Sequence, residues 1–177
     1  GGLLIEETCH WFDLARFVTG KEVASVSAEA TDRIHPDFDY EDVAYVQGRY
    51  TDGAVFQISH ALTGFDFSLE LQVHGTDGTA WCGLKEERYS ALDGGATDYL
   101  GIVSWAPINA SPGEAHVTTY DVEATEPFNI RDLTARTASD VSNGRPAAAE
   151  YIDGLRSLEI ALAARSSLET KSTIKVV

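Results

Sequence analysis

The chain has 177 residues, of which 44% are hydrophobic and 23% are charged, and its formal net charge is -15. This size and composition fit a globular domain with its own core. The excess of carboxylates argues against nucleic acid and anionic membranes as partners, because both require surplus Lys and Arg. No apolar run approaches the ~20 residues of a membrane span. We therefore expect one domain over residues 1–177 that binds neither nucleic acid nor a membrane.

The cysteines, the lack of a visible signal peptide and the start of the chain add three expectations. Cys9 and Cys82 are the only cysteines, and one pair is not a disulfide framework, so both are predicted to be free thiols. No signal peptide is visible, which predicts a cytoplasmic location. The chain contains no Met and opens on Gly1-Gly2 with no preceding strand. This opening suggests a fragment that lacks an upstream part of a longer protein.

The first segment predicts an amphipathic helix that ends at Gly20, a residue favoured at helix C-termini. The helix carries Glu6, His10 and Asp13 at spacings of four and three. These spacings place the three side chains along one side of a helix. A carboxylate one turn from an imidazole is an arrangement suited to proton transfer.

The middle of the chain predicts an antiparallel meander. Alternating small or apolar and polar residues predict a first strand at 23–30. Asp52-Gly53 and Asp77-Gly78 each separate two β-rich runs, and Asp-Gly is a strong hairpin signal. The paired runs are 42–50 with 54–60, and 68–75 with 79–82. Weaker patterns predict further strands at 88–92, 102–105 and 116–122.

Two helices are predicted to close the chain, followed by a tail at 172–177 that could form a last strand. The first helix ends at Asn143-Gly144, and its shared face holds Ile130, Leu133, Thr137 and Val141. The apolar face expected for the second holds Ile152, Leu155, Leu158 and Leu162. Separate runs of strands and helices indicate an α+β fold. We expect a largely antiparallel (mixed) sheet with helices on one face and the other face available for oligomerisation.

Several segments resemble one family in the same order along most of the chain. Gly1-Gly2 followed by Glu6, His10 and Asp13 resembles the start of the C-terminal domain of the Gfo/Idh/MocA oxidoreductases, relatives of glucose-fructose oxidoreductase and inositol dehydrogenase. The hairpin of 42–54, the turn of 73–79 and the ending of 143–167 resemble its later motifs.

The resemblance implies a two-domain protein. In that family an N-terminal Rossmann domain binds NAD or NADP, and the C-terminal domain supplies the substrate site and an oligomer-forming sheet. No Gly-x-Gly-x-x-Gly follows a strand in this chain. We therefore expect the Rossmann domain, with the family's Glu-Lys-Pro lysine, to be missing, and the fragment to bind no cofactor and to be inactive.

The resemblance also implies the site residues. His10 would act as the base for a substrate hydroxyl, and Glu6, where the family usually has Asp, would orient His10 or that hydroxyl. Glu7, Asp13 and His60 are candidates for substrate binding. Structural alternatives exist for each: a packed histidine for His10, a first-turn acid for Glu6, a surface charge for Glu7, a surface strand position for His60, and for Asp13 an ion pair with Arg16.

These observations predict the substrate-binding and catalytic half of an NAD(P)-dependent oxidoreductase acting on a sugar, cyclitol or related polyol. The partners expected are that substrate, the missing Rossmann domain and further copies of the chain. A non-catalytic α+β dimerisation or interaction domain is the alternative. No metal site is expected, because no second His or Cys cluster has ligand spacing.

Overall fold

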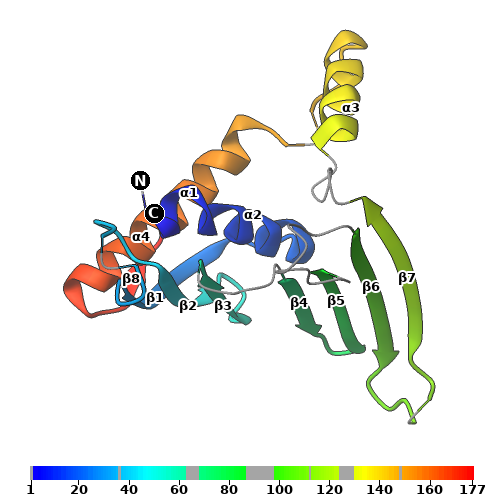
Figure 1. Ribbon diagram of the computed structural model, residues 1–177, viewed down its shortest axis with the longest axis horizontal. Helices are drawn as coiled ribbons and strands as arrows, with labels where there is room; N and C mark the ends of the chain where they lie inside the picture. The colour runs from blue at the N-terminus through cyan, green and yellow to red at the C-terminus, as the bar shows by residue number, and fades with distance from the viewer. Residues whose placement is uncertain are drawn as a thin grey trace. The chain divides into compact units, whose positions relative to one another are not determined.

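The computed structural model describes residues 2–35, 37–62, 68–86, 98–111, 113–123, 130–147 and 149–177. It confirms the α+β class, and its strands and helices are labelled in Figure 1. The chain divides into two compact units, unit 1 with Gly1–Thr63 and Arg145–Val177, and unit 2 with Gly64–Gly144. The strands form two four-stranded antiparallel sheets, one in each unit, where the sequence predicted a largely antiparallel (mixed) sheet.

The sheet of unit 1 has the strand order β3-β2-β1-β8. Its strands are β1 (Val23–Thr31), β2 (Val43–Tyr50), β3 (Val55–Ala61) and β8 (Ile174–Lys175). The predicted hairpin between β2 and β3 is confirmed. Gly53 adopts φ +93°, and the Asp52 Oδ1 atom accepts the Ala54 N–H at 3.0 Å. The turn therefore uses both residues of the Asp-Gly pair, one for its backbone freedom and one for its carboxylate.

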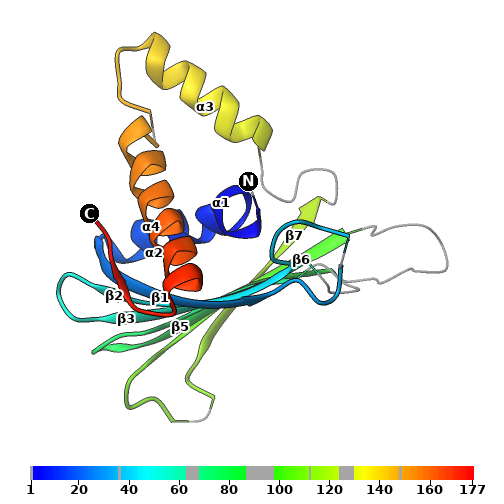
Figure 2. The ribbon, with the colours of Figure 1, turned by 90° about the vertical axis from the view of Figure 1, so that its left-hand side faces the viewer.

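Three helices cover one face of this sheet (Figure 2): α1 (Leu3–Glu6), α2 (Thr8–Thr19) and α4 (Tyr151–Thr170). Burial along β2 alternates, so every second side chain points into the layer between sheet and helices. The buried apolar side chains form one cluster, which includes Tyr50, Phe12, Leu3, Leu4, Ile160, Val26 and Val46. All the fully buried apolar side chains that the structure describes belong to unit 1.

The first helix differs from the expectation, because it is broken at Glu7 into α1 and α2. Glu7 has φ -112° and ψ -51°, and the Thr8 hydroxyl donates to the Leu3 carbonyl at 3.1 Å. A side-chain hydroxyl that bonds a carbonyl of the preceding turn competes with the regular backbone ladder. The C-terminus of α2 is as predicted: Gly20 has φ +64° and its N–H bonds the Arg16 carbonyl at 2.7 Å.

The buried face of α4 is not the predicted leucine face. Small residues and Ile160 are buried instead, and the Ser167 hydroxyl accepts the N–H of Ala28 in β1 at 3.0 Å. Small side chains let the helix lie close to the strand, and that close approach brings Ser167 within reach of the backbone. The leucine face remains partly exposed, with Ile152 at 37%, Leu155 at 43%, Leu158 at 38% and Leu162 at 48%.

Unit 2 contains the second sheet, of order β4-β5-β6-β7, and the helix α3 (Ile130–Ser142). The strands are β4 (Ser68–His74), β5 (Gly78–Glu86), β6 (Asp98–Pro107) and β7 (His116–Glu123). The hairpin at Asp77-Gly78 and the helix ending before Gly144 are confirmed. The strand expected at 88–92 lies outside the described residues. Apart from those with masked side chains, no residue of β4 to β7 or of α3 is fully buried.

Candidate functional site

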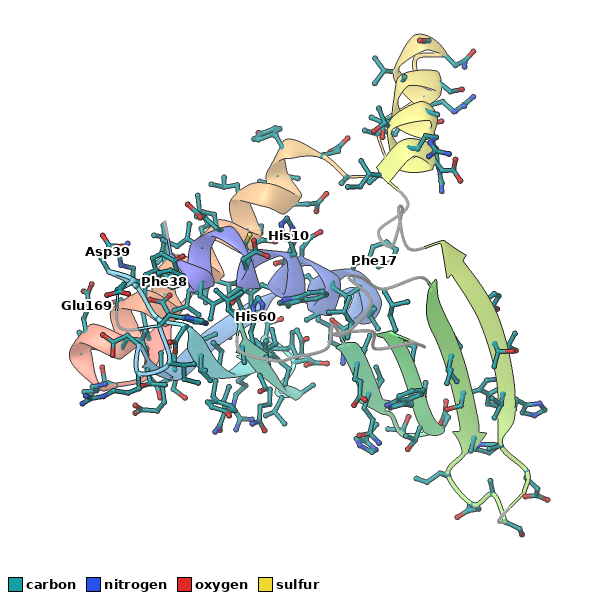
Figure 3. The ribbon with its side chains drawn as sticks, in the orientation of Figure 1. His10, Phe17, Phe38, Asp39, His60 and Glu169 are labelled. Carbon is teal, nitrogen blue, oxygen red and sulfur yellow. The ribbon has the colours of Figure 1, made fainter. Side chains whose placement is uncertain are left out.

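Helix α2 presents two contrasting sides. Thr8, Phe12 and Arg16, at intervals of four, are buried against the rest of unit 1. His10 on α2 is exposed, as are Glu6 at the end of α1 and Glu7 at the break between the two helices. Figure 3 shows His10 on this helix, and no hydrogen bond of its ring is formed within the described part of the chain. The structural alternative for His10, a packed histidine, is wrong, and its ring is free to meet a ligand.

Asp13 is held by an ion pair, as its structural alternative predicted. Its Oδ1 atom lies 3.3 Å from Nη1 of Arg16 and accepts the Ser157 hydroxyl of α4 at 3.1 Å. Both contacts use the same carboxylate oxygen; the ion pair lies within α2, and the bond with Ser157 joins α2 to α4. They support a structural role for Asp13, since its oxygen serves two protein partners before any ligand arrives.

Arg16 is the centre of this ion-pair network. Its guanidinium bonds both oxygens of Glu22, Nη2 to Oε1 at 2.7 Å and Nε to Oε2 at 2.9 Å, and lies 3.6 Å from Asp153 Oδ1. The Arg16 side chain is 10% exposed, whereas its three acidic partners are 38% to 54% exposed. The hydrogen bond from Arg16 holds the pKa of Glu22 below its ordinary value. The network fixes α2, and thus the orientation of His10, against the start of α4.

His60 lies near the end of β3 and contacts the helix that carries His10. Its Nδ1 atom is 3.0 Å from the Thr8 hydroxyl oxygen, and its ring meets the Trp11 ring edge-on, with centroids 6.1 Å apart. Desolvation by burial lowers the pKa of His60, and the charge of Glu7 opposes that shift. His60 is therefore half-buried beneath α2 rather than a simple surface residue of the strand.

Thr8 and Trp11 were not identified from the sequence. Thr8 is separated from His60 by 52 positions, and no local pattern links a helix residue to a strand residue at that distance. The only available signal was that Thr8 and Trp11 flank His10 in sequence. Their contact with His60 arises because α2 packs against β3.

A separate hollow of about 320 Å³ lies elsewhere in unit 1. It is lined by the end of β1, the loop before β2 and the C-terminal end of α4, with Asp32, Asp39, Glu41 and Lys171 among its side chains. Neither His10 nor His60 lines it. The predicted site is therefore an open helix surface with a half-buried histidine beneath it.

The described residues hold no group of three or more His, Cys, Asp or Glu side chains that could bind a metal ion. Cys9 and Cys82 are free thiols, as predicted. Burial raises the pKa of the Cys9 thiol, which makes it a weak nucleophile at neutral pH. Among the described residues, no helix is both long and apolar enough to cross a membrane.

The fold and the site describe an α+β domain in which a helix with exposed acid and imidazole groups lies on an antiparallel sheet. Residues 1–81 match the model of the GFO/IDH/MocA C-terminal domain. Myo-inositol 2-dehydrogenase of Thermotoga maritima is 27% identical over 182 aligned residues, which cover 99% of this chain and 49% of that protein. These matches confirm the resemblance of the chain to the C-terminal domains of the Gfo/Idh/MocA oxidoreductases.

Solved structures support the fold. An aldose-aldose oxidoreductase from Caulobacter crescentus, complexed with glycerol, matches with a TM-score of 0.70 at 20% identity, over 99% of this chain and 50% of its own. A levoglucosan dehydrogenase, in complex with NADH and L-sorbose, matches with a TM-score of 0.72 at 18% identity, over 100% and 50%. The chain thus spans about half the length of the relatives that it matches.

Proposed function

We propose that this chain is the substrate-binding and catalytic half of an NAD(P)-dependent oxidoreductase that acts on a sugar, cyclitol or related polyol. The observation that carries the proposal is the exposed His10 on α2, a helix whose opposite side is buried in the core, with the exposed Glu6 and Glu7 just before α2 in sequence. Relatives named for myo-inositol, aldose and levoglucosan chemistry support the substrate class.

In this proposal His10 accepts the proton of the substrate hydroxyl as the carbon that bears it is oxidised. An imidazole ring suits that task, because a ring nitrogen with a lone pair can accept a proton. Glu6, four residues before His10, is proposed to orient His10 or the substrate hydroxyl. Arg16 and its acidic partners keep the helix in place.

We propose that the described residues do not themselves form a dinucleotide site. Both sheets are antiparallel, whereas dinucleotides bind at the carboxyl ends of parallel strands, next to a Gly-rich turn that this sequence lacks. The nicotinamide, which supplies the hydride acceptor, is therefore proposed to be held by a Rossmann domain of a longer protein. The fragment alone is proposed to be inactive.

A protein that joins this chain to its nucleotide-binding domain provides the test. We expect reduction of NAD or NADP, followed at 340 nm, with myo-inositol or an aldose as substrate, and no reduction with the chain alone. Activity of the chain alone would contradict the proposal that a separate Rossmann domain binds the nicotinamide. Absence of activity in the longer protein across cyclitols, aldoses and linear polyols would contradict the proposed function.

We also propose that copies of the chain associate through one face of the unit 2 sheet. By register, the side chains of one face are nearly all apolar: Leu69, Leu71, Val73, Ala80, Cys82, Leu84, Val103 and Trp105, continued on β7 by His116, Thr118 and Tyr120. Val103 is 41% exposed and Trp105 50%. A contiguous apolar face of this kind is typical of an interaction surface.

A further inference from the structure

The hydrogen bonds of Thr8 restrict where the proton of His60 can lie. Thr8 is fully buried, and its hydroxyl oxygen has two neighbours, the Leu3 carbonyl oxygen at 3.1 Å and His60 Nδ1 at 3.0 Å. A hydroxyl has a single proton to donate, and a carbonyl oxygen can only accept. If the hydroxyl proton goes to Leu3, the proton of the second bond must come from Nδ1 of His60.

The opposite arrangement makes fewer bonds. If the hydroxyl donates to Nδ1, its contact with the Leu3 carbonyl is lost, and that carbonyl keeps only the Glu7 N–H at 3.1 Å. The first arrangement makes one more hydrogen bond from the same buried atoms. Because buried polar atoms are costly to leave unbonded, the arrangement with the proton on Nδ1 is favoured.

The other ring nitrogen is then an acceptor within reach of solvent. Nε2 of His60 has no hydrogen-bond partner among the described residues. Among the described residues, Oδ1 of Asp42 is the only side-chain nitrogen or oxygen that is fully buried and has no hydrogen-bond partner. Because Nε2 of His60 also has no partner, it cannot be fully buried. Trp11, edge-on at an interplanar angle of 86°, limits reorientation of the imidazole. The lowered pKa of His60 keeps the ring neutral at neutral pH.

We propose that Thr8 is a positioning residue that holds His60 as the Nδ1-protonated tautomer, so that Nε2 offers a lone pair to a substrate hydroxyl. The substrate part rests on the proposed function, whereas the tautomer does not. A neutral nitrogen with a lone pair accepts a hydrogen bond from an alcohol and gives none to an ether or a phosphate oxygen. His60 thereby selects a ligand that carries a free hydroxyl at this position.

The tautomer is tested by long-range ¹H–¹⁵N correlation spectra of the uniformly ¹⁵N-labelled chain at pH 7.5. A protonated and an unprotonated ring nitrogen have well separated ¹⁵N shifts, and the His60→Gln variant identifies the signals of His60 among the five histidines. We expect a protonated Nδ1 and an unprotonated Nε2. A spectrum with the proton mainly on Nε2 would overturn the proposal.

Two substitutions at Thr8 test its positioning role. Thr8→Ser keeps the hydroxyl and is expected to keep the Nδ1-protonated form. Thr8→Val, of similar size, removes the hydroxyl and is expected to move the proton largely to Nε2, with circular dichroism checking the fold. An unchanged tautomer in a folded Thr8→Val variant would contradict the role of Thr8. If Thr8→Val does not fold, the spectra of the natural chain and of Thr8→Ser still decide the tautomer.

The substrate contact is tested in the protein that joins this chain to a nucleotide-binding domain. Relative to the natural protein, His60→Phe is expected to raise KM for the polyol about tenfold with a smaller change in kcat. This pattern is expected because the substitution removes one hydrogen bond to the bound substrate. His60→Gln, whose amide oxygen can accept, should recover part of the loss. An active His60→Phe protein with an unchanged KM would overturn the proposed contact between His60 and the substrate. An inactive natural protein would overturn the proposed function instead, while the spectra decide the tautomer separately.

Discussion

The two units of this chain use their side chains differently. Unit 1 buries an extensive apolar cluster between three helices and a sheet, and it carries all the candidate site residues. The described side chains of the unit 2 strands are never fully buried, although one sheet face is nearly all apolar. The difference supports two of the proposals made above, that unit 1 holds the catalytic residues in place and that unit 2 associates with further copies of the chain.

The largest expected effect is on the core of unit 1. Phe12→Ala removes a fully buried ring and should lower the free energy of unfolding by about 3–5 kcal/mol, measured by urea denaturation. Phe17→Ala, on the same helix but at a residue that is 80% exposed, should change it by less than ~0.5 kcal/mol. Similar losses for the two variants would contradict the assignment of α2 to the core.

A matching truncation in unit 2 sharpens the contrast. Trp105 is 50% exposed and stacks on His116, with ring centroids 4.3 Å apart. Because the ring is only partly buried, Trp105→Ala should cost about 1–2 kcal/mol under conditions that keep the chain monomeric. A loss as large as that of Phe12→Ala would show that unit 2 has a core of its own.

The Arg16 network should give a pH-dependent effect. Arg16→Met leaves three carboxylates unpaired, and because these are partly exposed the cost at pH 7 is expected to be about 2 kcal/mol. The pKa of Glu22 is lower in the folded protein, so its contribution is present above the unfolded pKa and is lost as the pH falls through the folded value. The stability difference between the natural chain and Arg16→Met should therefore shrink below about pH 4.5.

A pair of adjacent threonines tests the associating face of unit 2. Thr118 lies by register on the apolar face and Thr119 on the opposite one, and both are exposed. A lysine on an apolar interface must lose its hydration, so Thr118→Lys should weaken self-association at least about tenfold in analytical ultracentrifugation. Thr119→Lys should leave it nearly unchanged. Equal effects, or a natural chain that stays monomeric at high concentration, would contradict this interface.

The sequence was sufficient where the signal is local. Asp52-Gly53 and Asp77-Gly78 predicted their hairpins because each pair marks the short connection between two strands that follow one another in sequence. The face of α4 was predicted wrongly because periodicity locates apolar residues, whereas close packing on β1 favours small ones such as Ala164 and Ser167. The contact between Thr8 and His60 depends on the packing of two distant elements, and no local pattern encodes it.

The central claim, that His10 takes the proton of a substrate hydroxyl, is tested most directly by the turnover of a His10→Ala variant in the protein that includes the nucleotide-binding domain. We expect kcat to fall about 10²–10⁴-fold at pH 7.5, with an unchanged free energy of unfolding because His10 is exposed. His35→Ala, at a half-buried histidine of unit 1 that lies between β1 and β2, is the control and should retain full turnover. A His10→Ala protein that turns over at the natural rate would contradict the claim.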